Sequence, residues 1–263
     1  MRKKARVLYG KNGVRRLYSE IAENYDRSKK LYITRLMERS EKPIIENFLN
    51  AEHPICSVDL GCGTGRYLKS LLAISRYVIA LDFSIDMIKV AMRKYGKFKD
   101  KADFIVADIE YLPFRKHSLN LALSTLVINH LENIENALNE IRRILKTKGV
   151  FIFTTLNKIV IDKYNRRYGI PQDTVLFVTE NIPPTYIYEK GMLEDEIREI
   201  LKNHGFKIVG FKPVAYWVLL GLLPKHDILL RVLQPYMQYL DFLAKILPSK
   251  YAFIHAFKVI KLG

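Results

Sequence analysis

The stretch that decides the fold runs from Val58 to Leu68 and reads VDLGCGTGRYL. An apolar run that begins at Ile55 leads into it, and the carboxylate of Asp59 stands just before a loop with glycine at every second position. A helical pattern of apolar residues then runs from Tyr67 to Ile74. This order predicts a strand, a tight turn and a helix, which together form the first half of a βαβ nucleotide-binding unit.

The glycine spacing differs from that of the dinucleotide-binding fingerprint. Gly61, Gly63 and Gly65 are separated by single residues, and Arg66 occupies the place of the third glycine in G-x-G-x-x-G. Asp59 precedes the loop by two residues, and a fixed negative charge is unfavourable beside a pyrophosphate. The same charge favours a ligand with an ammonium or sulfonium group. S-adenosylmethionine is one such ligand, because it carries an adenosine and a cationic sulfur but no phosphate.

The motif Asp59-x-Gly61-x-Gly63-x-Gly65 resembles the first motif of the class I S-adenosylmethionine-dependent methyltransferases. The closest resemblance is to the broad type 11 group that contains quinone-biosynthesis methyltransferases, and it extends from about Tyr18 to Thr155. It implies a doubly wound α/β fold with a mostly parallel, seven-stranded, Rossmann-like sheet. It also implies that the motif binds the methionine end of S-adenosylmethionine.

A second acid follows the next predicted strand, Tyr77 to Asp82. Asp82 lies 21 residues beyond Gly61, where a dinucleotide-type fold places the carboxylate that accepts hydrogen bonds from the ribose hydroxyls. Phe83 and Met87 are candidates for contact with the adenine, and both are equally acceptable as core residues.

A third acid follows the predicted strand Ala102 to Ala107. The sequence from Asp108 to Phe114 resembles the adenine-binding turn of the family. The resemblance implies that Asp108 accepts from the adenine amino group and that the main chain at Ile109 meets the edge of the ring. The alternative is a surface acid in a turn.

The segment after the fourth predicted strand, Leu119 to Ser124, is where this fold usually presents groups to the methyl acceptor. It contains neither the Asn/Asp-Pro-Pro-aromatic tetrad of amino-methylating DNA enzymes nor a Pro-Cys pair. Asn129 and His130 remain as polar candidates. His130 is the candidate general base because of its near-neutral pKa. A histidine that caps or packs against the next helix, Ile134 to Leu145, is the favoured alternative.

The chain divides into a helical cap, residues 1–50, and a cofactor-binding core, residues 51–157. Two helices are expected in the cap, and the second is predicted to begin at Ser40-Glu41-Lys42-Pro43, a plausible N-cap with an early-turn proline. By resemblance to the family, Tyr25 closes over the cofactor. Packing of its ring against the sheet is an equal alternative.

Two further regions complete the predicted organisation. Residues 158–191 read as an insertion or lid. Residues 192–263 finish the sheet with a helix and an antiparallel pair, Phe206 to Phe211 and Tyr251 to Ile260. An apolar helical insertion at residues 215–250 interrupts that pair. It is suited to covering a pocket, contacting a membrane surface, forming a dimer or packing on the domain itself.

Composition leaves the methyl acceptor open. The 263-residue chain has a formal net charge of +16, which indicates either a surface for nucleic acid or anionic lipid, or a solvated lysine-rich surface. A lipid-like or quinone-like small molecule is the preferred acceptor, and RNA is the alternative. A non-catalytic S-adenosylmethionine-binding scaffold subunit is the hypothesis outside the enzyme class.

The remaining composition restricts location and metal binding. No apolar run is long enough to span a membrane, and no signal-peptide core is apparent. Cys56 and Cys62 have no partners at metal-site spacing and do not make a disulfide framework. We therefore expect a cytoplasmic protein without a metal centre.

Overall fold

The computed structural model describes residues 5–27, 32–179, 182–216 and 247–263. Its centre is a seven-stranded sheet in the order β4-β3-β2-β5-β6-β10-β9, in which only β10 runs against its neighbours. The strands are β2 (Cys56–Leu60), β3 (Tyr77–Asp82), β4 (Ala102–Val106), β5 (Leu119–Thr125), β6 (Leu145–Leu156), β9 (Phe206–Val214) and β10 (Ile254–Lys261). The predicted doubly wound, mostly parallel seven-stranded sheet is therefore confirmed. Residues 217–246, most of the predicted apolar insertion, lie outside the described residues.

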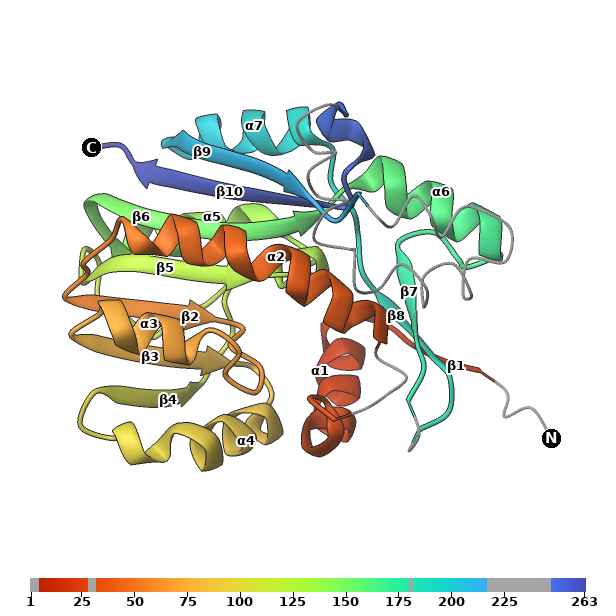
Figure 1. The fold of residues 1–263 in the computed structure, drawn as a ribbon, viewed down its shortest axis with the longest axis horizontal. Helices are drawn as coiled ribbons and strands as arrows, with labels where there is room; N and C mark the ends of the chain where they lie inside the picture. The colour runs from red at the N-terminus through yellow and green to blue at the C-terminus, as the bar shows by residue number, and fades with distance from the viewer. Residues whose placement is uncertain (1–4, 28–31, 180–181, 217–246) are drawn as a thin grey trace.

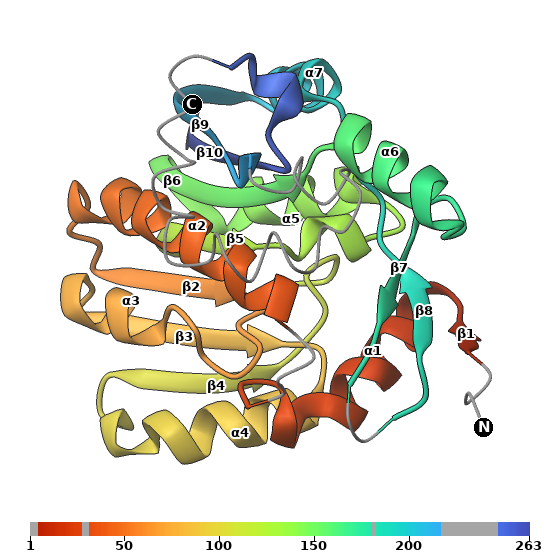
Figure 2. The same ribbon diagram turned by 45° about the vertical axis from the view of Figure 1, so that its right-hand side comes forward.

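Helices cover both faces of this sheet (Figures 1 and 2). One face packs against α2 (Tyr32–Asn50), α3 (Leu68–Ile74) and α4 (Ile85–Tyr95). The other packs against α5 (Ile134–Ile144) and α7 (Glu194–Asn203). The parallel strands are buried on both faces, which explains why their sequences are apolar throughout rather than alternating.

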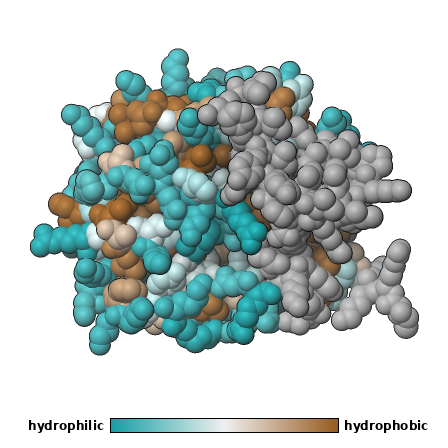
Figure 3. Space-filling model, in the orientation of Figure 1, coloured by the Kyte–Doolittle hydropathy of each residue, from teal (hydrophilic) through white to brown (hydrophobic). Residues whose placement is uncertain are grey.

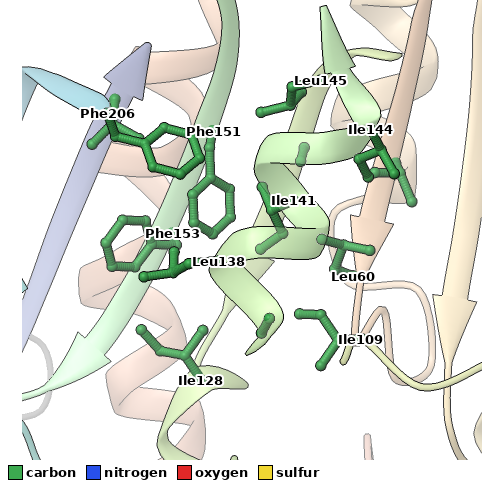
Figure 4. Packing of buried hydrophobic residues seen from close by; sticks show 14 of the residues in the cluster. Leu60, Ile109, Ile128, Leu138, Ile141, Ile144, Leu145, Phe151, Phe153 and Phe206 are labelled. Carbon is green, nitrogen blue, oxygen red and sulfur yellow. The ribbon is translucent and has the colours of Figure 1, made fainter. Parts of the chain in front are cut away.

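Aromatic and aliphatic side chains fill the layer between the sheet and α5 (Figure 4). The rings of Phe151 and Phe153 stack with centroids 4.7 Å apart, and Phe153 stacks on Phe257 of β10 at 5.2 Å. Ile141 and Leu138 of α5 pack onto the same layer. This packing fixes the strand ends that carry the functional residues.

A second, three-stranded sheet was not predicted. It has the order β1-β8-β7, with β1 (Arg6–Leu8) parallel to β8 (Thr185–Tyr188) and β7 (Thr174–Phe177) antiparallel to it. Residues 6–8 thereby join the 158–191 region, which also contains α6 (Lys158–Tyr168). Arg6 Nε donates to Thr185 Oγ1 at 2.8 Å. A strand of only three residues, Arg-Val-Leu, is too short to show an alternating pattern, so only its distant partner could have indicated it.

The predicted start of the second cap helix is wrong. α2 begins at Tyr32 rather than after Ser40, and Pro43 lies inside it. A proline within a helix removes one backbone hydrogen bond. Burial of Ile45 and Phe48 against the sheet offsets this cost, because the apolar face of α2 continues on both sides of the proline.

The remaining described elements are the helix α1 (Gly10–Ile21), which packs in a separate apolar cluster with β7, β8 and α4, and four short 3-10 helices. The 3-10 helices are η1 (Ala22–Asn24), η2 (Gly96–Phe98), η3 (Ile128–His130) and η7 (Ser249–Tyr251). Hydrophilic side chains occupy most of the described surface in Figure 3, with separate hydrophobic patches between them. Within the described residues, no helix is both long and apolar enough to cross a membrane.

Candidate functional site: a cavity at the strand ends

A cavity of about 640 Å³ lies at the carboxyl ends of β2, β3, β4 and β5. This is the edge at which open α/β sheets bind ligands. The volume is within the range of about 300–1,000 Å³ that is typical of small-molecule sites.

Nearly all of the predicted site residues meet in this cavity. Ten of them line it: Tyr25, Asp59, Gly61, Gly63, Asp82, Phe83, Met87, Asp108, Ile109 and His130. Gly65 does not. A Cβ on Gly65 would lie 2.9 Å from the ring of Tyr95 and 3.0 Å from Leu68, at φ +90°. Gly65 therefore serves the turn and its packing against α3 and α4.

The glycine loop is held against the adjacent strand by its own backbone. The amides of Gly61 and Cys62 donate to the carbonyl oxygen of Leu81 at 2.7 and 2.9 Å. Gly61 has φ +76°, and a Cβ there would come within 2.4 Å of Val127. Gly63 has φ +54°, but a Cβ there would meet no atom within 4 Å. The backbone at Gly63 is thus left bare toward the cavity.

Asp82 is organised by backbone amides. Its two carboxylate oxygens accept from Gly63 N at 2.9 Å and from Ser84 N at 2.8 Å. Burial raises the pKa of Asp82 to about 6, and the backbone hydrogen bonds from Ser84 and Gly63 oppose this rise. The carboxylate is therefore fixed in orientation, with further lone pairs available to accept from ligand hydroxyls.

Asp59 is the most isolated of the three acids. The residue is 2% exposed, and within the described part of the chain its side chain makes no hydrogen bond. Burial raises its pKa to about 7; Arg66 lowers it and Asp82 raises it further. A buried carboxylate without a partner is costly, so a cationic ligand group in the cavity is its natural complement.

Asp108 lies at the end of β4 and is held by a residue that sequence analysis did not single out. Lys11 of α1 forms ion pairs with both Asp108 and Glu110, and Asp108 also accepts from Glu110 N at 3.0 Å. The N-terminal helix thus closes over the adenine end of the predicted site.

Arg66 ties the glycine loop to the cap helix α2. Its guanidinium lies 2.8 Å from Glu38 Oε1 and 3.0 Å from Glu41 Oε2. Glu41 is fully buried and also accepts from Tyr67 Oη at 3.0 Å and from Thr154 Oγ1. These contacts join residues far apart in sequence, so no local pattern could predict them. The unusual position of Arg66 in the glycine motif was the only sequence feature that pointed to a role for this residue.

The segment that contains Tyr25 is also fixed to the loop. Thr64 Oγ1 donates to Asp26 at 2.8 Å, and Lys94 Nζ bonds both Asp26 at 2.9 Å and the Thr64 carbonyl at 2.7 Å. The Tyr25 ring lines the cavity, and burial raises its pKa to about 12. Its hydroxyl therefore stays protonated at neutral pH.

His130 does not cap the following helix, because Asn133 does so through its side chain. Its Nδ1 lies 2.9 Å from the carbonyl oxygen of Tyr188, and its Nε2 lies 3.0 Å from Tyr18 Oη. A carbonyl oxygen only accepts, so Nδ1 carries a proton; whenever the ring is neutral, Nε2 accepts from Tyr18. Asn129 has a structural role instead: it bonds Thr155 and the backbone of residues 156 and 190.

Glu189 adds a carboxylate beside His130. Its Oε1 lies 3.8 Å from His130 Nε2, and its side chain is only 10% exposed. Burial raises the pKa of Glu189, and His130 lowers it. Both side chains line the cavity together with Tyr18. No local pattern in the sequence marked Glu189 or Tyr18, because the contact joins α1, η3 and the end of β8.

A further part of the cavity wall is mainly apolar and aromatic; Asn165 of α6 also lines it, and its amide donates to the carbonyl oxygens of Pro171 and Thr174. We call this part the acceptor chamber; its residues are Ile161, Tyr164, Tyr168, Ile170, Val175, Leu176, Phe177, Val178, Tyr186 and Phe253. Nine of these ten come from α6, β7, β8 and the links between them, within the region predicted as an insertion or lid.

The cavity is acidic although the chain is strongly basic. The cationic side chains that line it, within the described residues, are Lys11 and Arg66, and each is paired with two carboxylates. The acidic side chains that line it are Asp26, Glu38, Asp59, Asp82, Asp108 and Glu189. A nucleoside with a positive charge fits this cavity. The backbone at Gly63 carries no side chain, the carboxylate of Asp82 is fixed in orientation, and acidic side chains outnumber basic ones.

Comparisons with known proteins agree with this geometry. A family model described as a methyltransferase domain matches residues 58–153. An uncharacterised protein of Methanocaldococcus jannaschii is 31% identical over 211 residues, which cover 76% of this chain and 78% of that protein. A malonyl-[acyl-carrier protein] O-methyltransferase of a Methylovorus species is 33% identical over 158 residues; the match covers 57% of this chain but only 51% of that enzyme.

The fold is also found among solved structures. An S-adenosylmethionine-dependent methyltransferase from Aquifex aeolicus superposes with a TM-score of 0.56 at 14% identity, covering 93% of this chain and 98% of that one. At this identity the match supports the fold alone. The fold, the sequence relatives and the matched domain together assign the chain to a family. The chain belongs to the class I S-adenosylmethionine-dependent methyltransferase family, with S-adenosylmethionine as cofactor and methyl transfer as activity.

Proposed function

We propose that the protein transfers the methyl group of S-adenosylmethionine to a small, largely apolar molecule bound in the acceptor chamber. The observation that carries the proposal is the lining of that chamber, which is aliphatic and aromatic along α6 and β7. Small-molecule sites are typically apolar with a few placed polar groups. The matched enzyme that is named for O-methylation of malonyl-[acyl-carrier protein] is consistent with a lipid-related acceptor.

In this proposal the two parts of the cavity have separate tasks. Asp59 with Gly61 and Gly63 binds the methionine end, and Asp82 accepts from the ribose hydroxyls. Asp108 and the backbone at Ile109 bind the adenine, with Phe83 and Met87 against the ring. S-adenosylmethionine supplies an electrophilic methyl group, and the protein aligns the acceptor with it and excludes water.

Two further assignments belong to the same proposal. Tyr25, which lines the cavity from the cap, closes over the bound cofactor. His130 serves as the base for the acceptor. Its position on the cavity wall, with Nδ1 bound to the Tyr188 carbonyl and Nε2 directed at Tyr18, supports this role.

RNA is the second candidate acceptor, and the net charge of +16 favours it. The acidic lining of the cavity argues against a polyanion entering it deeply. An RNA acceptor would therefore have to present a single extruded base.

A tritium-transfer assay separates the two candidates. Labelled S-adenosylmethionine is incubated with the protein and lipid extract, total RNA or protein extract. We expect label in the lipid fraction and none in RNA, with Asp82→Ala as a control that strongly reduces site-dependent transfer at low S-adenosylmethionine concentration. Label in RNA but not in lipid would contradict the proposed acceptor.

A further inference from the structure

The polar groups beside the acceptor chamber restrict the chemistry of the acceptor. We propose that Tyr18 and His130 remove a proton from the acceptor during methyl transfer, that Glu189 stabilises the resulting imidazolium, and that the acceptor is an uncharged molecule with an ionisable O–H group. This inference rests on the proposed function and adds a substrate class and two residues to it.

The first support is the direction of the hydrogen bonds. The Tyr188 carbonyl fixes the proton on His130 Nδ1, so Nε2 presents a lone pair to Tyr18 Oη at 3.0 Å. Burial raises the pKa of Tyr18 well above its usual value, so its hydroxyl keeps its proton and donates to Nε2. Tyr18 thus stands between a base and the cavity.

The ring environment keeps this arrangement in place. The Tyr18 ring makes edge contacts with His130 at 5.5 Å and with Phe177 of the chamber at 5.9 Å. Both Tyr18 and His130 line the cavity of which the chamber is a part, which places this pair beside the space open to an acceptor.

The second support is the charge of the cavity wall. In the described part of the chain, each cation of the lining already has two carboxylate partners, which leaves no free positive group for an anionic acceptor. Glu189, whose Oε1 is 3.8 Å from His130 Nε2, would repel a carboxylate substrate. The same carboxylate favours a positive charge on the His130 ring.

The step balances without another reactant. The acceptor oxygen forms a bond to the methyl carbon, the carbon–sulfur bond breaks, and its electron pair stays on sulfur as an uncharged thioether. The acceptor proton passes to Tyr18 Oη while the Tyr18 proton passes to His130 Nε2. One positive charge therefore leaves sulfur and one appears on the imidazole beside Glu189, and the proton is later released to solvent.

Two probes with the same apolar body test this assignment: 4-octylphenol, which must lose a proton, and 4-octylbenzoate, which is already ionised. With labelled S-adenosylmethionine we expect kcat/KM for the phenol to exceed that for the benzoate by at least about tenfold, the factor that 1.4 kcal/mol represents. His130→Asn keeps an amide donor for the Tyr188 carbonyl but has no base. Tyr18→Phe keeps the ring.

Each of these two variants should lower kcat for the phenol by about 10²–10⁴-fold, the usual effect of losing a general base. The residual kcat for the benzoate should change by less than about threefold, because an ionised acceptor needs no base. Glu189→Gln should lower kcat for the phenol by about tenfold. Calorimetry should show unchanged affinity for S-adenosylmethionine in all three.

The matched controls are residues that do not line the cavity. His204→Asn, at the end of α7, and Tyr9→Phe, whose side chain is 82% exposed, should behave as the unaltered protein. Preferred transfer to the benzoate, or phenol methylation that survives both Tyr18→Phe and His130→Asn, would contradict the inference. If lipid extract is labelled but neither probe is, this inference fails while the proposed function stands. Absence of label from lipid extract counts against the proposed function itself.

Discussion

The two parts of the cavity are built in different ways. The part that we propose for the cofactor consists of backbone and carboxylates at the ends of β2, β3 and β4, each delivered by a short local motif. The acceptor chamber consists mainly of side chains from α6, β7, β8 and the links between them, and β7 and β8 belong to the small sheet completed by the N-terminal strand β1. One part depends on exact turns and fixed charges, whereas the other depends on apolar surface. Their responses to substitution should therefore differ in kind.

The largest expected effect comes from the glycine loop. Gly61→Ala places a methyl group 2.4 Å from Val127 at a positive φ, so the loop must move and binding of S-adenosylmethionine should weaken by more than about 100-fold. Gly169→Ala is the matched control, since its φ is +62° but a Cβ there meets no atom within 4 Å. The control should lose only about 1–2 kcal/mol of unfolding free energy. Calorimetric titration and thermal unfolding measure the two effects. Equal cofactor affinity in both variants would show that the close approach to Val127 is unimportant.

The second-largest expected effect on cofactor affinity comes from removing the carboxylate of Asp82. Asp82→Ala should weaken cofactor binding by roughly 1.5–3 kcal/mol, the range for losing a charge-assisted partner. Asp86→Ala, on the outer side of α4, should leave the affinity unchanged and serves as the control. Calorimetric titration of both variants checks the prediction, and unchanged affinity in Asp82→Ala would refute the ribose assignment.

The third effect is a pH dependence of cofactor binding. Burial raises the pKa of Asp59 from 3.8 to about 7. In the protein without ligand, the free energy of unfolding therefore decreases as the pH rises from about 4 to about 7, because Asp59 ionises more easily in the unfolded chain. A cationic ligand favours the ionised form. Affinity for S-adenosylmethionine should therefore fall about tenfold between pH 8 and pH 6, with proton release on binding. Titrations in buffers of different ionisation enthalpy measure the released protons. Affinity independent of pH in this range would mean that Asp59 does not face the charge.

The smallest expected effect on cofactor binding comes from the acceptor chamber. Leu176→Gln should change affinity for S-adenosylmethionine by less than about twofold, since it alters only apolar lining, but should weaken 4-octylphenol binding by about tenfold. Val209→Gln, on an exposed position of β9, is the control for a polar substitution in a strand. Titration of each variant with both ligands checks this. A large loss of cofactor affinity in Leu176→Gln would contradict the division of the cavity into a part that binds the cofactor and a part that binds the acceptor.

The same difference explains what could be predicted from sequence. Asp59, Asp82 and Asp108 each follow a buried strand, and parallel strands bring their ends to one edge, so local patterns were sufficient to bring these residues together. Tyr18 and Glu189 meet His130 only through tertiary contacts between α1, β8 and η3, and nothing in their immediate sequence marks them.

Two errors in the fold have the same physical origin. Ser40 and Pro43 looked like a helix start because that rule uses neighbouring residues alone, whereas the burial of Ile45 and Phe48 allows the helix to continue through the proline. The strand Arg6–Leu8 is stable only because β8 supplies its hydrogen-bonding partner. Rules that use only neighbouring residues cannot predict either the burial of α2 or the pairing of β1 with β8.

The most direct measurement is a crystal structure of the protein with S-adenosylhomocysteine. We expect the nucleoside between Asp82 and Asp108, its ribose hydroxyls on Asp82, and its sulfur directed toward Tyr18 and the acceptor chamber. A nucleoside bound elsewhere, or one that makes no contact with Asp82 and the glycine loop, would contradict the account.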